Sequence, residues 1–152
     1  LLIVNVMNAF GERQHAEKFI PMTIKKLLND EEIIIHSYPD KKTSGTRFYI
    51  HGRNIAAAVL FLIKNGKNGE KYNITGEREV SNLEMAQIIA DTMGKPLKYK
   101  MTDCHTLRPG HDLRYGLDGS KMFEMGWKIP VPFDESIKNT ILWTLENQSW
   151  LE

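Results

Sequence analysis

Hydrophobic residues along the chain fall into short runs whose spacing alternates between strand and helix patterns. The run from Leu2 to Val6 is continuous and rich in β-branched residues, as in a strand buried on both faces of a parallel sheet. Apolar residues then recur every three or four positions. This spacing predicts a helix from about residue 17 or 20 to Asn29, with Pro21 in its first turn.

Three more strands and two more helices follow. Residues 32–36 and 47–50 have extended patterns on either side of a polar, Pro- and Gly-containing loop, and residues 72–74 form a brief strand. Residues 54–64 are apolar almost all round, so we expect a helix buried on most faces. At the start of the next helix, Ser81 and Glu84 have the spacing of a capping box in which each side chain satisfies the other's backbone N–H, and this helix ends at Gly94.

The rest of the chain adds a strand at residues 97–101, a short helix capped by Asp118 and a last helix capped by Asp134. The predicted fold class is therefore mixed α/β, with about five helices and four or five short strands. Since no linker or repeat divides the sequence, we expect a single domain over residues 1–152.

Composition excludes several classes of protein. Hydrophobic residues make up 41% of the 152 residues and charged residues 26%, and no apolar run approaches the ~20 residues that cross a bilayer. A formal net charge of +1 gives no support for nucleic acid as a partner. The single cysteine, Cys104, excludes an internal disulfide and, without a recognisable signal peptide, predicts a cytoplasmic protein.

The chain opens inside the first apolar run, without an initiator methionine. We expect from this that it is the C-terminal part of a longer protein. Residues 1–8 would then form a strand of a sheet supplied by the N-terminal part, and the partners of that strand would lie outside the chain.

A cluster of polar residues from Arg108 to Tyr115 carries candidate chemistry. It places two arginines, a histidine, an aspartate and a tyrosine around a Pro-Gly turn. Guanidinium groups suit phosphate oxygens, so Arg108 and His111 indicate a diphosphate site. The alternative, which stays open, is a solvated loop in which Arg108 pairs with Asp112.

Three further polar residues stand at or inside predicted strands. Asn8 ends the first strand just before a helix, a place where ligands of α/β proteins gather. Arg47 opens a strand, and Asn73 lies inside one, where asparagine is disfavoured. The simpler alternatives are a turn former at Asn8 and an exposed strand face at Asn73.

Motifs for dinucleotide chemistry are not found. The chain has neither Gly-x-Gly-x-x-Gly nor a P-loop, and we expect no catalytic Tyr-x-x-x-Lys pair. The histidines show no metal-ligand spacing. We therefore name no catalytic, cofactor-binding or metal-binding residue. The residues by themselves predict a lobe that binds a phosphate ligand or a sugar nucleotide.

Six segments, taken in order, resemble one family: residues 7–11, 17–21, 47–50, 72–76, 81–84 and 108–115. Together they are similar to the C-terminal half of the dTDP-glucose 4,6-dehydratases, which belong to the NAD-dependent epimerase/dehydratase (extended short-chain dehydrogenase/reductase) family. Arg-Pro-Gly-His-Asp followed by Arg-Tyr points to the 4,6-dehydratase branch.

This resemblance implies the substrate-binding lobe of a Rossmann-type enzyme whose NAD-binding domain and catalytic residues precede Leu1. The whole enzyme, a homodimer, would oxidise C4 of a nucleoside-diphosphate hexose with NAD, eliminate water across C5 and C6, and return the hydride to C6. The fragment alone would be inactive. The residues implied to contact the sugar nucleotide are Asn8, Lys18, Phe19, Arg47, Asn73, Arg108 and His111.

Three alternatives stay open at this point. A related epimerase or decarboxylase would use the same lobe, and a stand-alone module would bind a sugar nucleotide without chemistry. A purely structural reading makes Trp127 and the last helix an interaction face, and it predicts that Arg108→Ala leaves ligand binding intact.

Overall fold

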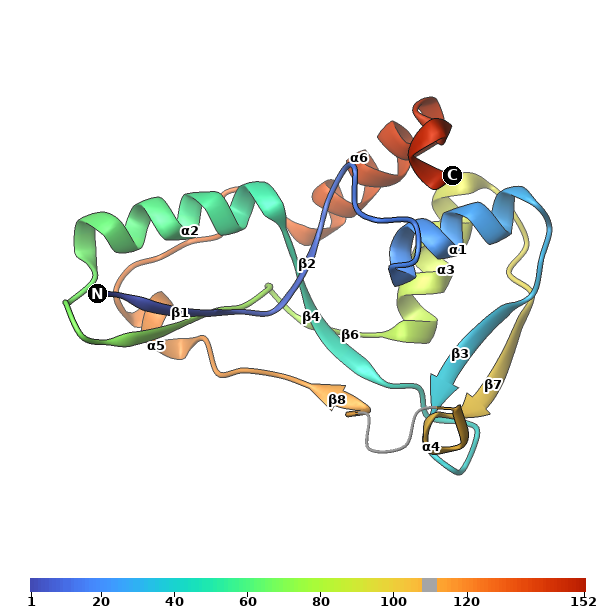
Figure 1. Ribbon diagram of the computed structural model, residues 1–152, viewed down its shortest axis with the longest axis horizontal. Helices are drawn as coiled ribbons and strands as arrows, with labels where there is room; N and C mark the ends of the chain where they lie inside the picture. Colours follow the sequence, from blue (N-terminus) through green and yellow to red (C-terminus); the bar gives the residue numbers. More distant parts are fainter. Residues whose placement is uncertain (108–111) are drawn as a thin grey trace.

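The computed structural model describes residues 1–107 and 112–152, with only the backbone described at residues 106–107 (Figure 1). Arg108 and His111, the two candidate diphosphate ligands, therefore lie outside the described residues. The strands are β1 (Ile3–Val6), β2 (Asn8–Phe10), β3 (Ile33–Ser37), β4 (Thr46–His51), β5 (Lys71–Ile74), β6 (Glu79–Ser81), β7 (Tyr99–Asp103) and β8 (Arg114–Tyr115). The helices are α1 (Phe19–Leu28), α2 (Gly52–Asn65), α3 (Asn82–Met93), α4 (Cys104–Leu107), α5 (Ser120–Glu124), α6 (Phe133–Glu146) and the 3₁₀ helix η1 (Gln148–Leu151).

Parallel pairing dominates the three small sheets of the described chain. β1 pairs with β5 and β3 pairs with β7, both in parallel. The third sheet is built on β4, which runs parallel to β2 and β8 and antiparallel to β6. Figure 1 shows β4 crossing the middle of the molecule, between α2 at one end and α1 with α3 at the other. The mixed α/β class predicted from the sequence is confirmed.

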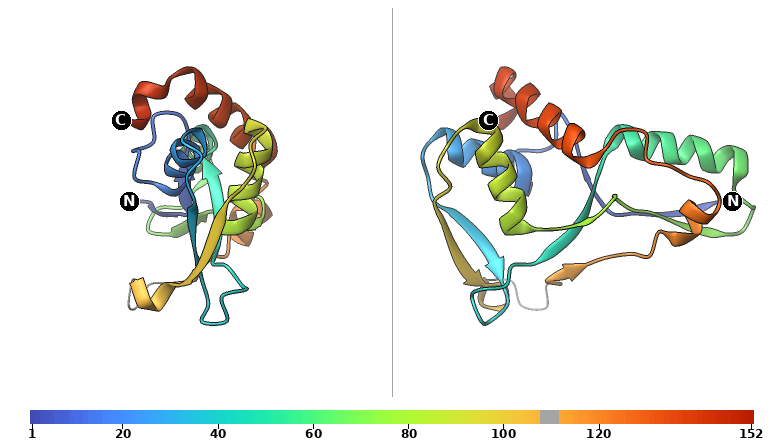
Figure 2. Two further views of the ribbon diagram at one scale, coloured as in Figure 1. Left: turned by 90° about the vertical axis from the view of Figure 1, so that its right-hand side faces the viewer. Right: turned by 180° about the vertical axis from the view of Figure 1, so that it is seen from behind.

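Two hydrophobic cores meet at β4. Successive side chains of a strand point to opposite faces, and accordingly Tyr49 packs into the core around α1, α3 and α6 while Ile50 packs into the core of α2, β5 and α5. Figure 2 shows α6 and η1 beside α1 and α3, with the two chain ends at opposite ends of the molecule. The first core, from α1, α3 and α6, supports one side of the site described below.

Local signals in the sequence explain the ends of α3. The Ser81 hydroxyl accepts a hydrogen bond from the backbone N–H of Glu84 at 3.0 Å, and Gly94 adopts a left-handed conformation with φ of 63°. The reciprocal half of the predicted capping box is different, because the Glu84 carboxylate instead accepts from Arg78 at 2.5 Å. The last helix also differs: it begins at Phe133, so Asp134 lies in its first turn and does not cap it.

The first strand differs most from the prediction. It ends at Val6, the buried Met7 follows, and Asn8 begins a separate strand in another sheet. The predicted absence of a partner is wrong, since β5 of the same chain pairs with β1. The strand is also not buried on both faces: Ile3 is 39% exposed and Val6 is 40% exposed.

The helix predicted to be buried on most faces is also more exposed than expected. Ala58 and Leu62 of α2 are buried, but Leu60 is 61% exposed and Ile63 is 67% exposed. Only one side of α2 packs on the β1–β5 layer, which leaves an apolar outer side.

Candidate ligand pocket

A cavity of about 800 Å³ opens between β2, β3, β4 and the segment that leads into α1. Its volume lies within the ~300–1,000 Å³ of typical small-molecule sites. Four of the residues implied by the family resemblance line it, and they come from three different segments: Asn8, Lys18, Phe19 and Arg47.

The local fold explains why these four residues meet. Asn8 of β2 lies opposite Tyr49 of β4 in a parallel register, so the side chains of the two strands are neighbours across the ladder. Lys18 is the N-cap residue of α1 and Phe19 is its first helical residue, and both line the cavity, so the N-terminus of α1 borders it. That end of a helix carries unpaired N–H groups and a partial positive charge, which favour an anion.

The guanidinium of Arg47 is held by backbone carbonyls. Nη1 donates to the Thr46 carbonyl at 2.7 Å and to the Leu113 carbonyl at 2.5 Å, and Nη2 donates to the Asp112 carbonyl at 2.8 Å. These bonds attach residues 112–113 to β4. An arginine has five N–H donors, and within residues 1–107 and 112–152 these bonds leave Nε and one hydrogen of Nη2 without an acceptor.

Asn73 is not among the residues that line the cavity. Its side-chain oxygen accepts from Asn5 at 3.0 Å and its nitrogen donates to the Asp118 carbonyl at 2.8 Å. The amide thus joins β1 and β5 to Asp118, two residues before α5, and these contacts account for an asparagine inside a strand.

Tyr49 and Asn82 line the pocket and were not identified from the sequence. The Tyr49 hydroxyl donates to Oδ1 of Asn82 at 3.1 Å, and burial raises the pKa of this phenol to about 12 although nearby Arg47 lowers it. A signal for Tyr49 was present: it stands two positions after Arg47 on one strand, so both side chains lie on the same face. With this pKa Tyr49 acts as a neutral hydrogen-bonding group and not as a base.

The charges around the pocket favour an anionic ligand. Lysines 18 and 26 and Arg47 supply three cations, against the two carboxylates of Glu17 and Asp112. Nζ of Lys26 donates to the Glu32 carbonyl at 3.1 Å, whereas the Lys18 ammonium meets no acceptor within the described residues. Lys18 is therefore the cation best placed to contact a phosphate.

The Tyr-x-x-x-Lys spacing does occur once, contrary to our expectation, at Tyr38 and Lys42. These residues lie in a turn and not on a helix, because the Tyr38 N–H bonds to the Thr43 carbonyl and Asp40 accepts from the Lys42 N–H. The spacing therefore does not place the two side chains on one helical face. In residues 1–107 and 112–152, no three His, Cys, Asp or Glu side chains form a metal-binding group, and no helix is long and apolar enough to span a membrane.

Comparison with known proteins agrees with the resemblance seen in the sequence. The model of the NAD dependent epimerase/dehydratase family matches residues 1–75. The dTDP-glucose 4,6-dehydratase of Xanthomonas campestris pv. campestris is 33% identical to this chain, over 100% of the chain and 44% of the relative.

Solved structures show the same relationship. DesIV, a dTDP-glucose 4,6-dehydratase from Streptomyces venezuelae solved with NAD, superimposes with a TM-score of 0.83 at 30% identity, over 99% of this chain and 45% of DesIV. The UDP-glucose 4-epimerase of Thermotoga maritima, solved with UDP-glucose, shares the fold with a TM-score of 0.79 at 22% identity, over 97% of this chain and 46% of the epimerase.

The chain thus spans a little under half the length of the relatives it matches. The sequence match covers 100% of this chain and the fold match covers 99% of it. The chain belongs to the NAD-dependent epimerase/dehydratase family.

Proposed function

We propose that this chain is the sugar-nucleotide-binding portion of an NAD-dependent nucleoside-diphosphate-hexose 4,6-dehydratase. The observation that carries this proposal is the pocket of about 800 Å³, which gathers Asn8, Lys18, Phe19 and Arg47 on a cationic surface. The 4,6-dehydratase activity of the relatives that match the whole chain supports the choice of reaction.

Each pocket residue has a role that its geometry allows. The Lys18 ammonium and the unused donors of Arg47 would bind the diphosphate, and the helix N-terminus at Phe19 would add backbone N–H groups. Asn8 and Tyr49 would hydrogen-bond the sugar. This binding energy, remote from the reacting carbon, would hold the hexose in a productive geometry, which is a catalytic contribution of its own.

The cofactor does not fit the residues of this chain. The sequence has no glycine-rich dinucleotide loop, and its single Tyr-x-x-x-Lys spacing lies in a turn. We therefore assign this chain no step through NAD. We propose that the other half of the enzyme, which this chain does not cover, binds NAD. The exposed Ile3 and Val6 of β1 and the apolar outer side of α2 offer a surface for that half.

Further parts of this proposal go beyond the pocket. Arg108 and His111 would complete the diphosphate site, and the whole enzyme would be a homodimer, which sedimentation of the full-length protein measures. A cytoplasmic location fits the single free cysteine, Cys104. By itself the chain would bind substrate without turnover.

Calorimetric titration of the chain with dTDP-glucose, UDP-glucose and dTDP tests the proposal. We expect saturable binding that weakens by about tenfold in Lys18→Gln, because one charge-assisted bond to a phosphate is lost. The matched control is Lys98→Gln, which removes an exposed lysine away from the pocket and should leave the affinity unchanged. Absence of binding to all three ligands, or equal weakening in both variants, would contradict the proposal.

A further inference from the structure

Residues 11–18, which we call the pocket loop, connect β2 to α1 and carry Gln14, Glu17 and Lys18 into the pocket. Few backbone bonds hold this loop. The Lys18 N–H bonds to the His15 carbonyl at 2.9 Å, and the Gln14 side chain donates to the Ala9 carbonyl at 2.8 Å. At its far end the Lys18 carbonyl accepts from the Met22 N–H of α1 at 2.9 Å, so residues 11–17 are the part of the loop that depends on side-chain contacts.

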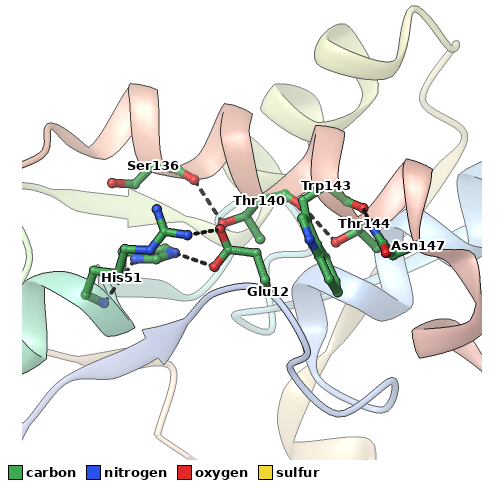
Figure 3. Close-up of polar contacts among 8 residues, drawn as sticks. Glu12, His51, Ser136, Thr140, Trp143, Thr144 and Asn147 are labelled. Carbon is green, nitrogen blue, oxygen red and sulfur yellow. Dashed lines mark hydrogen bonds and ion pairs between the residues drawn. The ribbon is translucent and has the colours of Figure 1, made fainter.

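Glu12 attaches the loop to the start of α2. Its Oε2 lies 3.1 Å from Nε2 of His51 and its Oε1 lies 3.1 Å from Nη2 of Arg53. The Glu12 side chain is only 14% exposed and that of His51 only 7%. Figure 3 shows the Glu12 carboxylate facing His51, with Trp143 of α6 on its other side.

The hydrogen bonds around His51 indicate which of its ring nitrogens carries the hydrogen that faces Glu12. Nδ1 of His51 accepts from the Arg53 backbone N–H at 3.1 Å and caps α2, so the ring hydrogen is on Nε2 and is donated to Glu12. Burial alone would raise the pKa of the Glu12 carboxyl. The bond from its own backbone N–H and the neighbouring His51 and Arg53 outweigh this effect and lower the pKa. Glu12 is therefore a carboxylate in the folded protein.

Arg13 attaches the same loop to α6 and η1. Its guanidinium carbon lies 5.0 Å from the ring centre of Trp143 on α6 and 5.9 Å from that of Trp150 on η1. The two rings are themselves 6.4 Å apart, so Arg13 covers both. The Arg13 backbone is left-handed, with φ of 65°, a conformation that few non-glycine residues adopt.

We infer that Glu12 and Arg13 are positioning residues that clamp the pocket loop between α2 and the α6–η1 segment and so determine where Lys18 lies in the pocket. The two contacts are on consecutive residues and reach separate elements, so neither can replace the other. The expected effect on ligand affinity rests on the proposed function, whereas the expected effect on the amide protection of the pocket loop does not.

Amide hydrogen exchange of the pocket loop, measured by NMR, tests the clamp without any ligand. We expect Glu12→Ala and Arg13→Ala each to accelerate exchange of the Lys18 amide by about threefold to thirtyfold, with core amides such as that of Ile89 unchanged. Glu12→Gln keeps an acceptor for His51, and Arg13→Lys keeps a cation over the rings, so both should recover part of the protection. These two conservative variants also keep the test valid if an alanine variant fails to fold.

Arg78→Ala is the matched control. The Arg78 guanidinium lies 4.9 Å from the Phe133 ring centre and pairs with Glu84, so its contacts resemble those of Arg13 but do not touch the pocket loop. This variant should leave exchange of the Lys18 amide unchanged. Unchanged exchange in both Glu12→Ala and Arg13→Ala, or equal acceleration in Arg78→Ala, would overturn the inference.

A titration with dTDP then separates the inference from the proposed function. If the wild-type chain binds dTDP, the clamp predicts that affinity falls in Glu12→Ala and Arg13→Ala by about the same factor as loop protection. Full affinity in these variants would overturn the positioning role. If the wild-type chain binds no dTDP but the variants loosen the loop, the proposed function fails while the clamp stands.

Discussion

Replacement of Arg47 by alanine tests whether its guanidinium anchors residues 112–113 to β4. The guanidinium makes three charge-assisted bonds to carbonyls, two of them to residues 112 and 113, which are far away in sequence. Bonds of this type contribute ~1.5–3 kcal/mol each when buried. Arg47 is only half-buried and the Thr46 bond is local, so the loss in free energy of unfolding should be about 2 kcal/mol.

Urea denaturation measures this loss. A decrease of about 2 kcal/mol corresponds to a melting temperature lower by about 4–8 °C in a chain of this size. Arg47→Lys should recover at most half of the loss, because a single ammonium cannot donate to both distant carbonyls in the fork geometry of a guanidinium. Lys98→Ala, at an exposed lysine without these contacts, is the control. If Arg47→Ala changed stability by less than ~0.5 kcal/mol, as a surface substitution does, the anchoring of residues 112–113 by Arg47 would be refuted.

Three other substitutions test separate parts of the account. Gly76→Ala should cost about 1–3 kcal/mol in urea denaturation, because the added Cβ would overlap the Tyr49 carbonyl oxygen. Tyr49→Phe should cost about 1 kcal/mol by removing the bond to Asn82, and it should abolish the tyrosine that ionises near pH 12 in a spectrophotometric titration. The Arg114 guanidinium and the Thr46 hydroxyl lower the pKa of Glu79 below 4.5, so its stabilising effect is complete above pH 4.5 and is lost as the pH falls through the lowered pKa. The stability difference between wild type and Glu79→Gln, measured from pH 6 downward, should therefore close with acid; a constant difference would contradict the ion pair.

Elements with a strong local signal could be predicted from the sequence to within two residues. The apolar spacing predicted α1, the β-branched run predicted β3, and Ser81 with Gly94 bounded α3. These signals act within one turn or one strand, so tertiary contacts did not need to be known. The Ser81 cap and the left-handed Gly94 are both present in the structure.

Elements that exist only through tertiary pairing could not be predicted. The strands β2, β6 and β8 have two or three residues each and depend on β4, which pairs with all three. The break at Met7 has the same cause, since the pairing of Asn8 with Tyr49 takes the chain into a second sheet. An isolated run of apolar residues carries no information about such a change of partner.

The residues of the candidate site also divide into those that could be predicted from the sequence and those that could not. Lys18 and Arg47 were expected at the site from the family resemblance, and both line the pocket. Asn73 could not be distinguished from a ligand-binding residue, since an asparagine in a strand looks the same in sequence whether it bonds a ligand or, as in this fold, Asn5 and Asp118. The clamp of Glu12 and Arg13 left no sequence signal, because its partners on α2 and α6 are brought close only by folding.

Amide chemical shifts in NMR spectra would map the binding of dTDP onto the chain. We expect saturable shifts to concentrate at Asn8, Lys18, Phe19 and Arg47, the four residues that share the pocket. Shifts centred on Asn73 and β5 instead, or no shifts at any dTDP concentration, would contradict the claim that this pocket binds a nucleoside diphosphate.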